Sequence, residues 1–346
     1  MQRGTQNTSN REEVMSAEGL NATRESLEVL ALEKEYLNTT KELRRAKGYL
    51  QRRNLQEHID ELKFELGWAY MDCGEYEKGM SLYHTLSWRV HGEMKCNGLT
   101  RALTEMGHYG EARRLLERGL KEFPESCALW TNLGILHGIL GDHFNALNCF
   151  GAAIKFNHDR SSGPFYNKAL ALMELESYTD AAFIIDRLIE EYPEEPKYLA
   201  DRGNCALGAG YPHEALQYFG KAMALFSESP DTHTGISIYA GFCSAYMGLG
   251  MKKEGMEIAL EGLKEFPDGD PVLYQNAGAT FYEMGWRKEA IEILKEGVKK
   301  FPDDEELKEC LKNIEDDSDD PDDKIKPPIL GLFLLMALLY KRGRKK

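Results

Sequence analysis

The chain has 346 residues, enough for about two domains of ordinary size with a well-buried core. Hydrophobic residues make up 42% and charged residues 29%, a composition typical of a folded protein rather than a disordered one. There are 57 acidic against 43 basic side chains, so the formal charge is −14. Such a chain repels phosphate backbones over most of its surface, and we expect no nucleic-acid partner.

Residues 1–23 are expected to be disordered, and the polar stretch from Met1 to Glu13 lacks the apolar segment of a signal peptide. Seven cysteines are scattered along the chain without paired spacing. An odd number without pairing favours free thiols in a reducing compartment over a disulfide framework.

Residues 24–59 predict one long amphipathic helix, because apolar residues recur at spacings of three and four, with an interruption at Thr39. A weak coiled coil is a possible role for this helix. The segment from Lys41 to Arg53 carries six basic residues and one acid, Glu42. A solvated helix face is the simplest explanation for this segment, and binding to anionic lipid or to an acidic partner is the alternative.

Residues 60–302 carry a repeated pattern with a period near 34 residues. A turn glycine is followed five residues later by a small residue, as in GEYEKG at Gly74 and GDHFNA at Gly141. The small residues fall at positions 79, 112, 146, 181, 215, 255 and 290. Between the turns, apolar residues recur at helical spacing, and Phe-Pro or Tyr-Pro pairs end several units. Each unit therefore predicts two antiparallel helices, and the single step of 40 residues predicts a longer loop near residues 226–235.

This pattern resembles the tetratricopeptide repeat (TPR). The copy that fits the family pattern best has these residues at its signature positions: Trp130, Leu133, Gly134, His137, Ala146, Phe150 and Ala153. The resemblance extends from Asp60 to Phe301, and it implies an all-α fold, a right-handed α-solenoid of about seven helix-turn-helix repeats. Lys168 and Arg202 depart from the family pattern, because each stands where a leucine is usual. Residues 303–314 continue a helical pattern and predict a helix that caps the last repeat.

The sequence contains no motif that would supply catalysis or bind a metal. HExxH, GxSxG, a phosphate-binding loop and a dinucleotide-binding GxGxxG after a strand are all missing. The nine histidines lie in different repeats without ligand spacing, and the acidic run from Asp316 to Asp323 lacks the glycine and distal glutamate of a calcium loop. We therefore expect no enzymatic activity, no metal, no cofactor and no small-molecule substrate.

In the resembled family, positions 2, 5, 9, 12 and 13 of each repeat's first helix line a concave groove. Carried onto this sequence, the register assigns a peptide-binding groove to Phe64, Trp68, Met71, Met94, Arg101, Ile135, Ile139, Tyr166, Leu170, Met173, Lys197, Asn204, Met247 and Tyr282. Asn97, Thr131 and Ser237 fall at equivalent positions. Any single position could instead belong to the core between repeats.

The lining of this predicted groove points to an apolar ligand. It is rich in aromatic residues and methionine in the first four repeats, which suits a partner protein's peptide or amphipathic helix. Some family members bind acidic chaperone tails through a clamp of two Lys, two Asn and one Arg. Here only Asn167 and Lys197 match that clamp, and Asp201 stands where the arginine should be, so we do not expect such a ligand.

The C-terminal part predicts an acidic flexible linker at residues 315–328 and an apolar tail with a basic end at residues 329–346. The tail residues expected to contact lipid are Ile329, Leu330, Leu332, Phe333, Leu334, Leu335, Met336, Leu338, Leu339 and Tyr340. Twelve helical residues span about 18 Å against a hydrocarbon core of about 30 Å, so a tail anchor would need snorkelling basic side chains or a thinned bilayer. A tail lying in the interface on anionic lipid, or docking in the protein's own groove, is the alternative.

Together these features predict a non-enzymatic scaffold for protein–protein interaction. Its groove would bind a partner's peptide or amphipathic helix, its tail would tether it to a membrane, and its repeat domain would face the cytoplasm. The alternative function is a chaperone or targeting factor that shields hydrophobic segments of client proteins. The alternative location is a soluble cytoplasmic protein.

Overall fold

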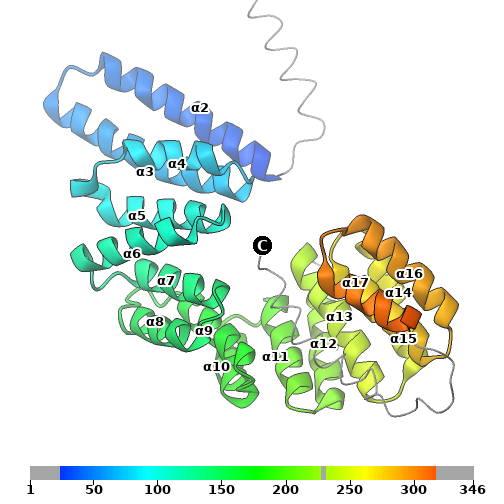
Figure 1. The fold of residues 1–346 in the computed structure, drawn as a ribbon. Coiled ribbons are helices and arrows are strands. Elements are labelled where there is room, and N and C mark those ends of the chain that lie inside the picture. Colours follow the sequence, from blue (N-terminus) through cyan, green and yellow to red (C-terminus); the bar gives the residue numbers. More distant parts are fainter. Residues whose placement is uncertain (1–23, 227–230, 317–346) are drawn as a thin grey trace, which may run out of the picture. The chain divides into compact units, whose positions relative to one another are not determined.

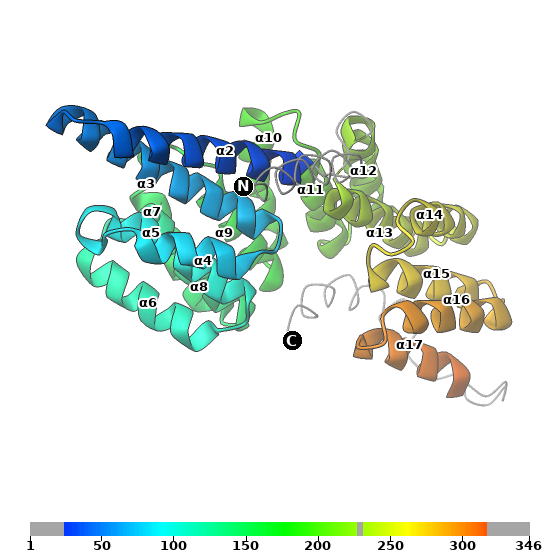
Figure 2. The same ribbon diagram turned by 90° about the horizontal axis from the view of Figure 1, so that it is seen from above.

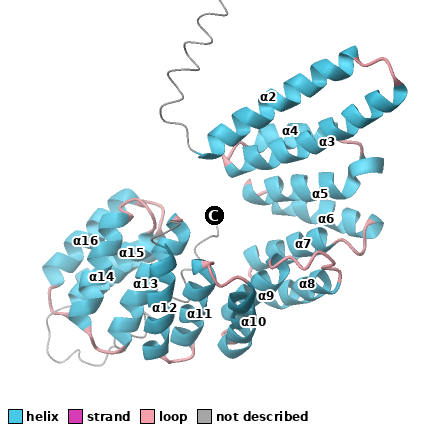
Figure 3. Cartoon of the chain, turned by 180° about the vertical axis from the view of Figure 1, so that it is seen from behind, coloured by secondary structure: helices cyan, strands magenta, loops and turns pink. Residues whose placement is uncertain are grey.

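The computed structural model describes residues 24–226 and 231–316. Within these ranges every regular element is an α-helix, drawn in cyan in Figure 3. The predicted all-α solenoid of about seven helix pairs is confirmed for this part of the chain. The segment 1–23, most of the acidic linker and the tail at 329–346 lie outside the described residues.

The helices, labelled in Figure 1, form two units, residues 1–136 and 137–346, and the border falls within α7. The N-terminal unit holds α2 (Arg24–Arg45), α3 (Tyr49–Asp72), α4 (Tyr76–Thr85), α5 (Trp88–Glu105), α6 (Tyr109–Glu122) and most of α7 (Cys127–Ile139). The C-terminal unit holds α8 (His143–Lys155), α9 (Gly163–Glu174), α10 (Tyr178–Glu191), α11 (Pro196–Gly208), α12 (Pro212–Phe226), α13 (Thr232–Gly248), α14 (Lys252–Glu265), α15 (Pro271–Glu283), α16 (Arg287–Lys300) and α17 (Glu305–Asp316).

Within each unit, two layers of helices follow from the way the pairs stack. The two helices of a pair contact each other: α3 contacts α4, and α11 contacts α12. The first helices also contact the first helices of the next pair, α3 with α5, α11 with α13, and α13 with α15 (Figure 2). The first helices therefore form one layer of each unit, which we call the first-helix surface. At the C-terminal end, Leu307, Cys310 and Ile314 of α17 are buried against the last pair.

The turn inside each pair needs a left-handed backbone. Six turn glycines have φ between 72° and 83°: Gly74, Gly107, Gly141, Gly210, Gly250 and Gly285. Glycine reaches this region without the steric clash that a Cβ causes, which explains the glycine at the repeat period. Glu176 stands at the same point of its repeat and has φ of 59°, so one turn is made without glycine.

A buried aromatic side chain from a second helix joins one repeat to the next. Tyr83 of α4 is fully buried between Gly67 of α3 and Gly98 of α5. A Cβ added at Gly98 would lie 2.5 Å from the Tyr83 ring, so only glycine fits there. The arrangement recurs in the C-terminal unit, where Phe219 of α12 lies between glycines of α11 and α13. This contact ties successive first helices together at a fixed spacing.

The single helix predicted over residues 24–59 is wrong. The chain instead folds back on itself, because α2 ends at Arg45 and α3 begins at Tyr49, after Gly48 (Figure 1). The predicted interruption at Thr39 does not occur, since its hydroxyl donates to the carbonyl of Glu35 at 3.0 Å and the side chain is buried in the hairpin. The first helix of the first repeat is therefore 24 residues long and is covered by α2.

The structure contradicts the C-terminal part of the longer loop predicted near residues 226–235. α12 continues to Phe226 and α13 begins at Thr232, so residues 232–235 are helical. Asp231 caps α13, because its carboxylate accepts from the backbone N–H groups of His233 and Thr234 at 3.3 and 3.1 Å. Most of the extra length of this repeat therefore extends a first helix to 17 residues.

Arg202 shows how the fold accommodates a departure from the family pattern. Its guanidinium donates to Asp186 at 2.8 Å and to Glu214 at 2.9 Å, and it lies over the ring of Tyr218. Three partners thus hold a half-buried cation where the pattern has leucine, because a buried charge without partners would be unfavourable.

Among the described residues, no helix combines the length and the apolar character needed to cross a bilayer.

Candidate functional site

The first-helix surface of the N-terminal unit carries five of the predicted groove residues with partly exposed side chains. Phe64 and Trp68 lie on α3, Met94 and Arg101 on α5, and Ile135 on α7. Phe64 and Trp68 contact each other edge to face, with ring centroids 5.9 Å apart. The sequence register thus places this set on one layer of one unit.

Arg101 joins α5 to α3 at this surface. Its guanidinium lies 4.2 Å from the centroid of the Trp68 ring and donates to Asp72 at 2.8 Å. The indole N–H of Trp68 is buried without a hydrogen-bond partner among the described residues. A buried donor without an acceptor is uncommon in native structures.

A ladder of amide side chains continues from α5 to α7. Asn132 donates to the side-chain oxygen of Asn97 at 2.6 Å and to the hydroxyl of Thr100 at 3.2 Å. Thr100 in turn donates to the carbonyl of Cys96, so it is satisfied within its own helix. This arrangement leaves the amide group of Asn97 as a donor at the partly exposed surface.

The first-helix surface of the C-terminal unit is more polar. Tyr166 of α9 donates to the carboxylate of Asp201 on α11 at 2.7 Å. Asn204 donates to Asp201 at 3.4 Å and to Ser237 of α13 at 3.3 Å. Burial, together with the Asp201 charge, raises the pKa of Tyr166, so this phenol stays a protonated donor. Lys197 lies over the rings of Tyr166 and Tyr198.

Three predicted groove residues belong to the core instead. Met71, Met173 and Met247 are each at most 5% exposed and pack in separate hydrophobic clusters. Their positions face the second helix of their own repeat, so they cannot line a surface. Ile139, Leu170 and Tyr282 are partly buried, and the last two also contact core residues.

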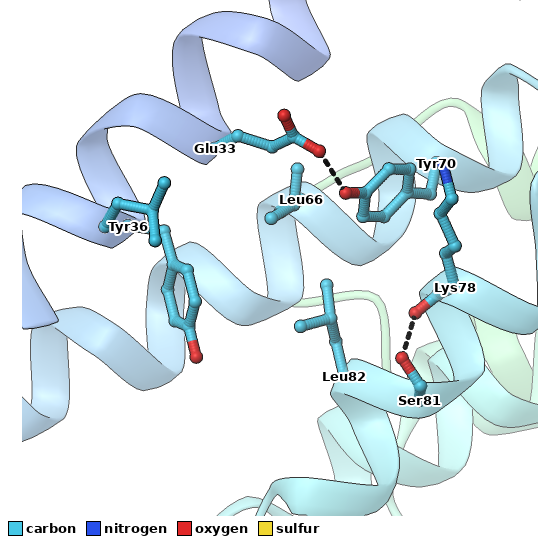
Figure 4. Close-up of a pocket in the computed structure, with 8 residues that line it drawn as sticks. Glu33, Tyr36, Leu66, Tyr70, Lys78, Ser81 and Leu82 are labelled. Atoms are coloured by element: carbon cyan, nitrogen blue, oxygen red, sulfur yellow. Dashed lines mark hydrogen bonds between the residues drawn. The ribbon is translucent and has the colours of Figure 1, made fainter. Parts of the chain in front are cut away.

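The structure also contains a pocket that the sequence did not predict. It has a volume of about 340 Å³ and lies between α2, α3 and α4 (Figure 4). Glu33 accepts a hydrogen bond from the Tyr70 hydroxyl at its edge, and the pKa of Tyr70 is raised by burial and by this carboxylate. Lys78 lies 5.2 Å from the centroid of the same ring. The pocket was missed because it exists only when α2 folds back onto α3.

A second pocket of about 390 Å³ lies between α4, α5 and α6 and is also absent from the sequence prediction. Trp88 forms one wall, with its indole N–H donating to Glu122 at 2.6 Å and Arg118 lying 4.2 Å from the ring centroid. The sequence signal that could have found it is Trp88 near the start of the second repeat. Neither pocket is lined by a predicted groove residue.

Burial raises the pKa of several cysteine thiols among the described residues. It raises the pKa of the thiols of Cys149 and Cys243 to about 11, which keeps them protonated near neutral pH. In the described ranges, no group of three or more His, Cys, Asp and Glu residues could hold a metal ion. What the surfaces offer is aromatic, amide and cationic contact.

The comparisons with known proteins agree with this fold. Residues 166–230 match the tetratricopeptide repeat family. A tetratricopeptide repeat protein from Parabacteroides merdae superposes with a TM-score of 0.57 at 18% identity, over 74% of this chain and 98% of that one. A search of the curated proteins finds no match.

Two further solved structures are similar over a large part of this chain. The APC/C hetero-tetramer Cut9-Hcn1 has a TM-score of 0.57 at 14% identity, over 79% of this chain and 58% of that one. Yeast Tom70 has a TM-score of 0.55 at 13% identity, over 85% of this chain and 60% of that one. The chain thus spans less than two thirds of either neighbour, and at these identities the likeness shows the fold alone. The described chain therefore has a tetratricopeptide-repeat-type α-solenoid fold, within which residues 166–230 match the family itself.

Proposed function

We propose that the protein is a non-enzymatic scaffold whose first-helix surface in the N-terminal unit binds an amphipathic helix of a partner protein. The observation that carries this proposal is the partly exposed set of Phe64, Trp68 and Arg101 on α3 and α5. Aromatic residues, above all tryptophan, and arginine contribute most of the binding energy at protein interfaces, because they bury much apolar area and also offer polar contacts.

The spacing of the helices supports a helical ligand. Packed helix axes lie about 8–10 Å apart, and residues i and i+7 of a helix are about 10.5 Å apart along its axis. A partner helix that runs across α3, α5 and α7 would therefore present one apolar residue to each of these three helices, and those residues would be seven positions apart in the partner. Trp68, Arg101 and Ile135 stand at equivalent positions of the three helices and would be the contact points.

Polar groups would fix the orientation of the bound segment. Asn97 has a donor amide beside the apolar residues, and Asn132 holds its side chain in place. The buried indole N–H of Trp68 gains an acceptor if a partner group displaces Arg101. A partner that supplies an acceptor to this donor removes the free-energy penalty of leaving it unpaired in the unbound protein.

The similar structures support the class of function and not the partner. The Cut9-Hcn1 neighbour is a hetero-tetramer, so a protein with this type of fold can serve within an assembly of several chains. The alternative function, shielding of many hydrophobic clients, depended on a methionine-rich lining. Because Met71, Met173 and Met247 are in the core, that lining is reduced to Met94, which favours a defined partner over many clients.

The proposal includes a membrane tether at residues 329–346. Its support is the sequence alone: twelve residues without charge from Ile329 to Tyr340, followed by KRGRKK. Burial of the apolar side chains in lipid stabilises membrane binding of such a segment, and attraction between its basic end and anionic headgroups stabilises it further.

Binding of helical peptides to the full-length chain tests the proposal. A library of amphipathic peptides with apolar residues at i, i+3, i+4 and i+7 is screened, and the affinity of the best binder is measured by calorimetry. Trp68→Ala should weaken it at least tenfold, because a central aromatic contact is worth about 2 kcal/mol or more. Phe144→Ala, which removes an exposed aromatic ring from a second helix, is the matched control and should leave the affinity unchanged. Equal effects of the two substitutions would refute the proposed site.

A further inference from the structure

We propose that the exposed face of the α2–α3 hairpin is a binding surface for anionic lipid bilayers, separate from the first-helix surface and from the tail. The hairpin carries the basic segment that the proposed scaffold function leaves unexplained. The exposed leucine and cationic side chains of α2 share one face of that helix.

The exposed leucines of α2 define the face. Leu27, Leu30 and Leu37 are 55%, 46% and 55% exposed, although leucine on a helix of a packed hairpin is normally directed inward. At 3.6 residues per turn, the three fall within an arc of about 80° of the helix. The opposite side of α2, with Thr39 and Leu43, packs on α3.

The same face carries the cations of α2. Lys34, Lys41, Arg44 and Arg45 lie within an arc of about 100° that includes the three leucines, and all four are exposed. The exposed acids of α2, Glu28, Glu35 and Glu42, fall together about 60–100° further round the helix. In a chain with a formal charge of −14, a face with four cations and no acid is a local exception.

Further exposed apolar and cationic side chains lie at the turn between the two helices. Tyr49 and Leu50 are 78% and 70% exposed, and Lys47, Arg52 and Arg53 around them are exposed as well. Arg53 pairs with Glu57 at 2.9 Å. For the other cations of the hairpin face, the described residues provide no ion pair. α3 begins without a side-chain cap and without an acid in its first turn, which leaves its positive end open to an anion.

This combination fits a lipid surface better than the other possible occupants. Anionic headgroups attract the cations, and the leucine and tyrosine side chains reach the boundary of the acyl chains. A second copy of α2 is disfavoured, because the spacing of the face would place Lys34, Lys41 and Arg44 along the seam of a coiled coil, where like charges repel. Nucleic acid would use the cations but would leave the leucines in water.

Sedimentation of the full-length protein with vesicles tests this inference. Vesicles of phosphatidylcholine alone are compared with vesicles that contain phosphatidylserine at about 30%. The variant Lys34→Gln, Lys41→Gln, Arg44→Gln, Arg45→Gln should lose at least tenfold in affinity for the anionic vesicles and change little on the neutral ones. The variant Leu27→Ser, Leu30→Ser, Leu37→Ser should also weaken anionic binding, because it keeps the charge and removes the apolar contact.

A matched control removes four exposed cations elsewhere: Arg114→Gln, Lys264→Gln, Lys288→Gln and Lys299→Gln. It changes the net charge equally and should retain the affinity of the original protein. Equal loss in the control and in the hairpin variant would show that only total charge matters, and no loss in either would assign all binding to another part of the chain. Both results overturn the inference.

The other occupants have their own readouts. Hairpin-dependent binding to a DNA or RNA oligonucleotide without hairpin-dependent vesicle binding, or a dimer in light scattering that the leucine variant abolishes, would also overturn it. Because every variant leaves the first-helix surface intact, peptide binding is measured in parallel. Failure of the lipid surface is thereby distinguished from failure of the scaffold proposal.

Discussion

The guanidinium of Arg101 lies 4.2 Å from the centre of the Trp68 ring and donates to Asp72 at 2.8 Å, so one side chain of α5 holds two residues of α3. Both contacts are partly exposed, and each is worth a fraction of a kcal/mol to about 1 kcal/mol. Arg101→Ala should therefore lower the free energy of unfolding by about 1 kcal/mol in urea titrations. Arg113→Ala breaks only an exposed pair with Glu117 and should cost less than about 0.5 kcal/mol. Equal costs would mean that the Arg101 contacts do not stabilise the repeat junction.

The aromatic contact between repeats predicts a difference between two glycines of the C-terminal unit. A Cβ at Gly241 would lie 2.3 Å from the buried Phe219 ring, whereas nothing lies within 4 Å of a Cβ at Gly220. Gly241→Ala should destabilise the protein by about 1–3 kcal/mol through overpacking. Gly220→Ala, inside α12, should stabilise it by about 0.5–1 kcal/mol because alanine favours the helix. Thermal and urea unfolding measure the stability of the two variants. A Gly241→Ala protein as stable as the original would contradict the packing of Phe219 against Gly241.

Buried thiols predict a loss of stability at alkaline pH. Burial raises the pKa of Cys243 from an ordinary value of 9.0 to about 11. The unfolded chain therefore releases this proton first as pH rises, and the stabilising effect is complete below about pH 9 and is lost as pH rises through about 11. By about pH 10, this one thiol should account for about 1 kcal/mol of lost stability.

Urea midpoints at about pH 8 and about pH 10 measure this loss. Cys243→Ala should flatten the dependence. An unchanged slope in the Cys243 variant would show that this thiol does not titrate between the two states.

The proposed membrane tether is tested by truncation. We expect full-length protein to remain with membranes after carbonate extraction, because about a dozen apolar residues at its C-terminus would be buried in lipid. A version that ends at Asp323 should be released. Release of both forms would remove the tether from the account and would make the tail a candidate ligand of the protein's own first-helix surface.

The fold could be predicted from the sequence because each helix pair is specified by short sequence patterns that recur along the chain. The turn glycines, such as Gly74 and Gly285, need a left-handed backbone that other residues adopt at a cost, so they mark each helix pair. The hairpin at the N-terminus carries no such repeated signal. Gly48 interrupts the helix there, but the apolar spacing on both sides is continuous, and so the sequence suggested one helix.

The surface was predicted less well, because the register assigns a position and not an exposure. Trp68 and Met71 are three residues apart on α3, yet Trp68 is partly exposed and Met71 is in the core. The difference depends on packing against α4, which no single position reveals. The pocket bordered by Glu33 and Tyr70 depends on two helices whose contact was not foreseen, and it could not be predicted from either one.

Hydrogen exchange of the full-length protein, with and without its best-binding peptide, tests the central claim most directly. The account predicts that the peptide protects amides of the first helices α3, α5 and α7, and leaves the second helices α4 and α6 unchanged. Protection confined to α4 and α6, around the pocket that Trp88 lines, would contradict it and would place the binding site on the opposite layer of the unit.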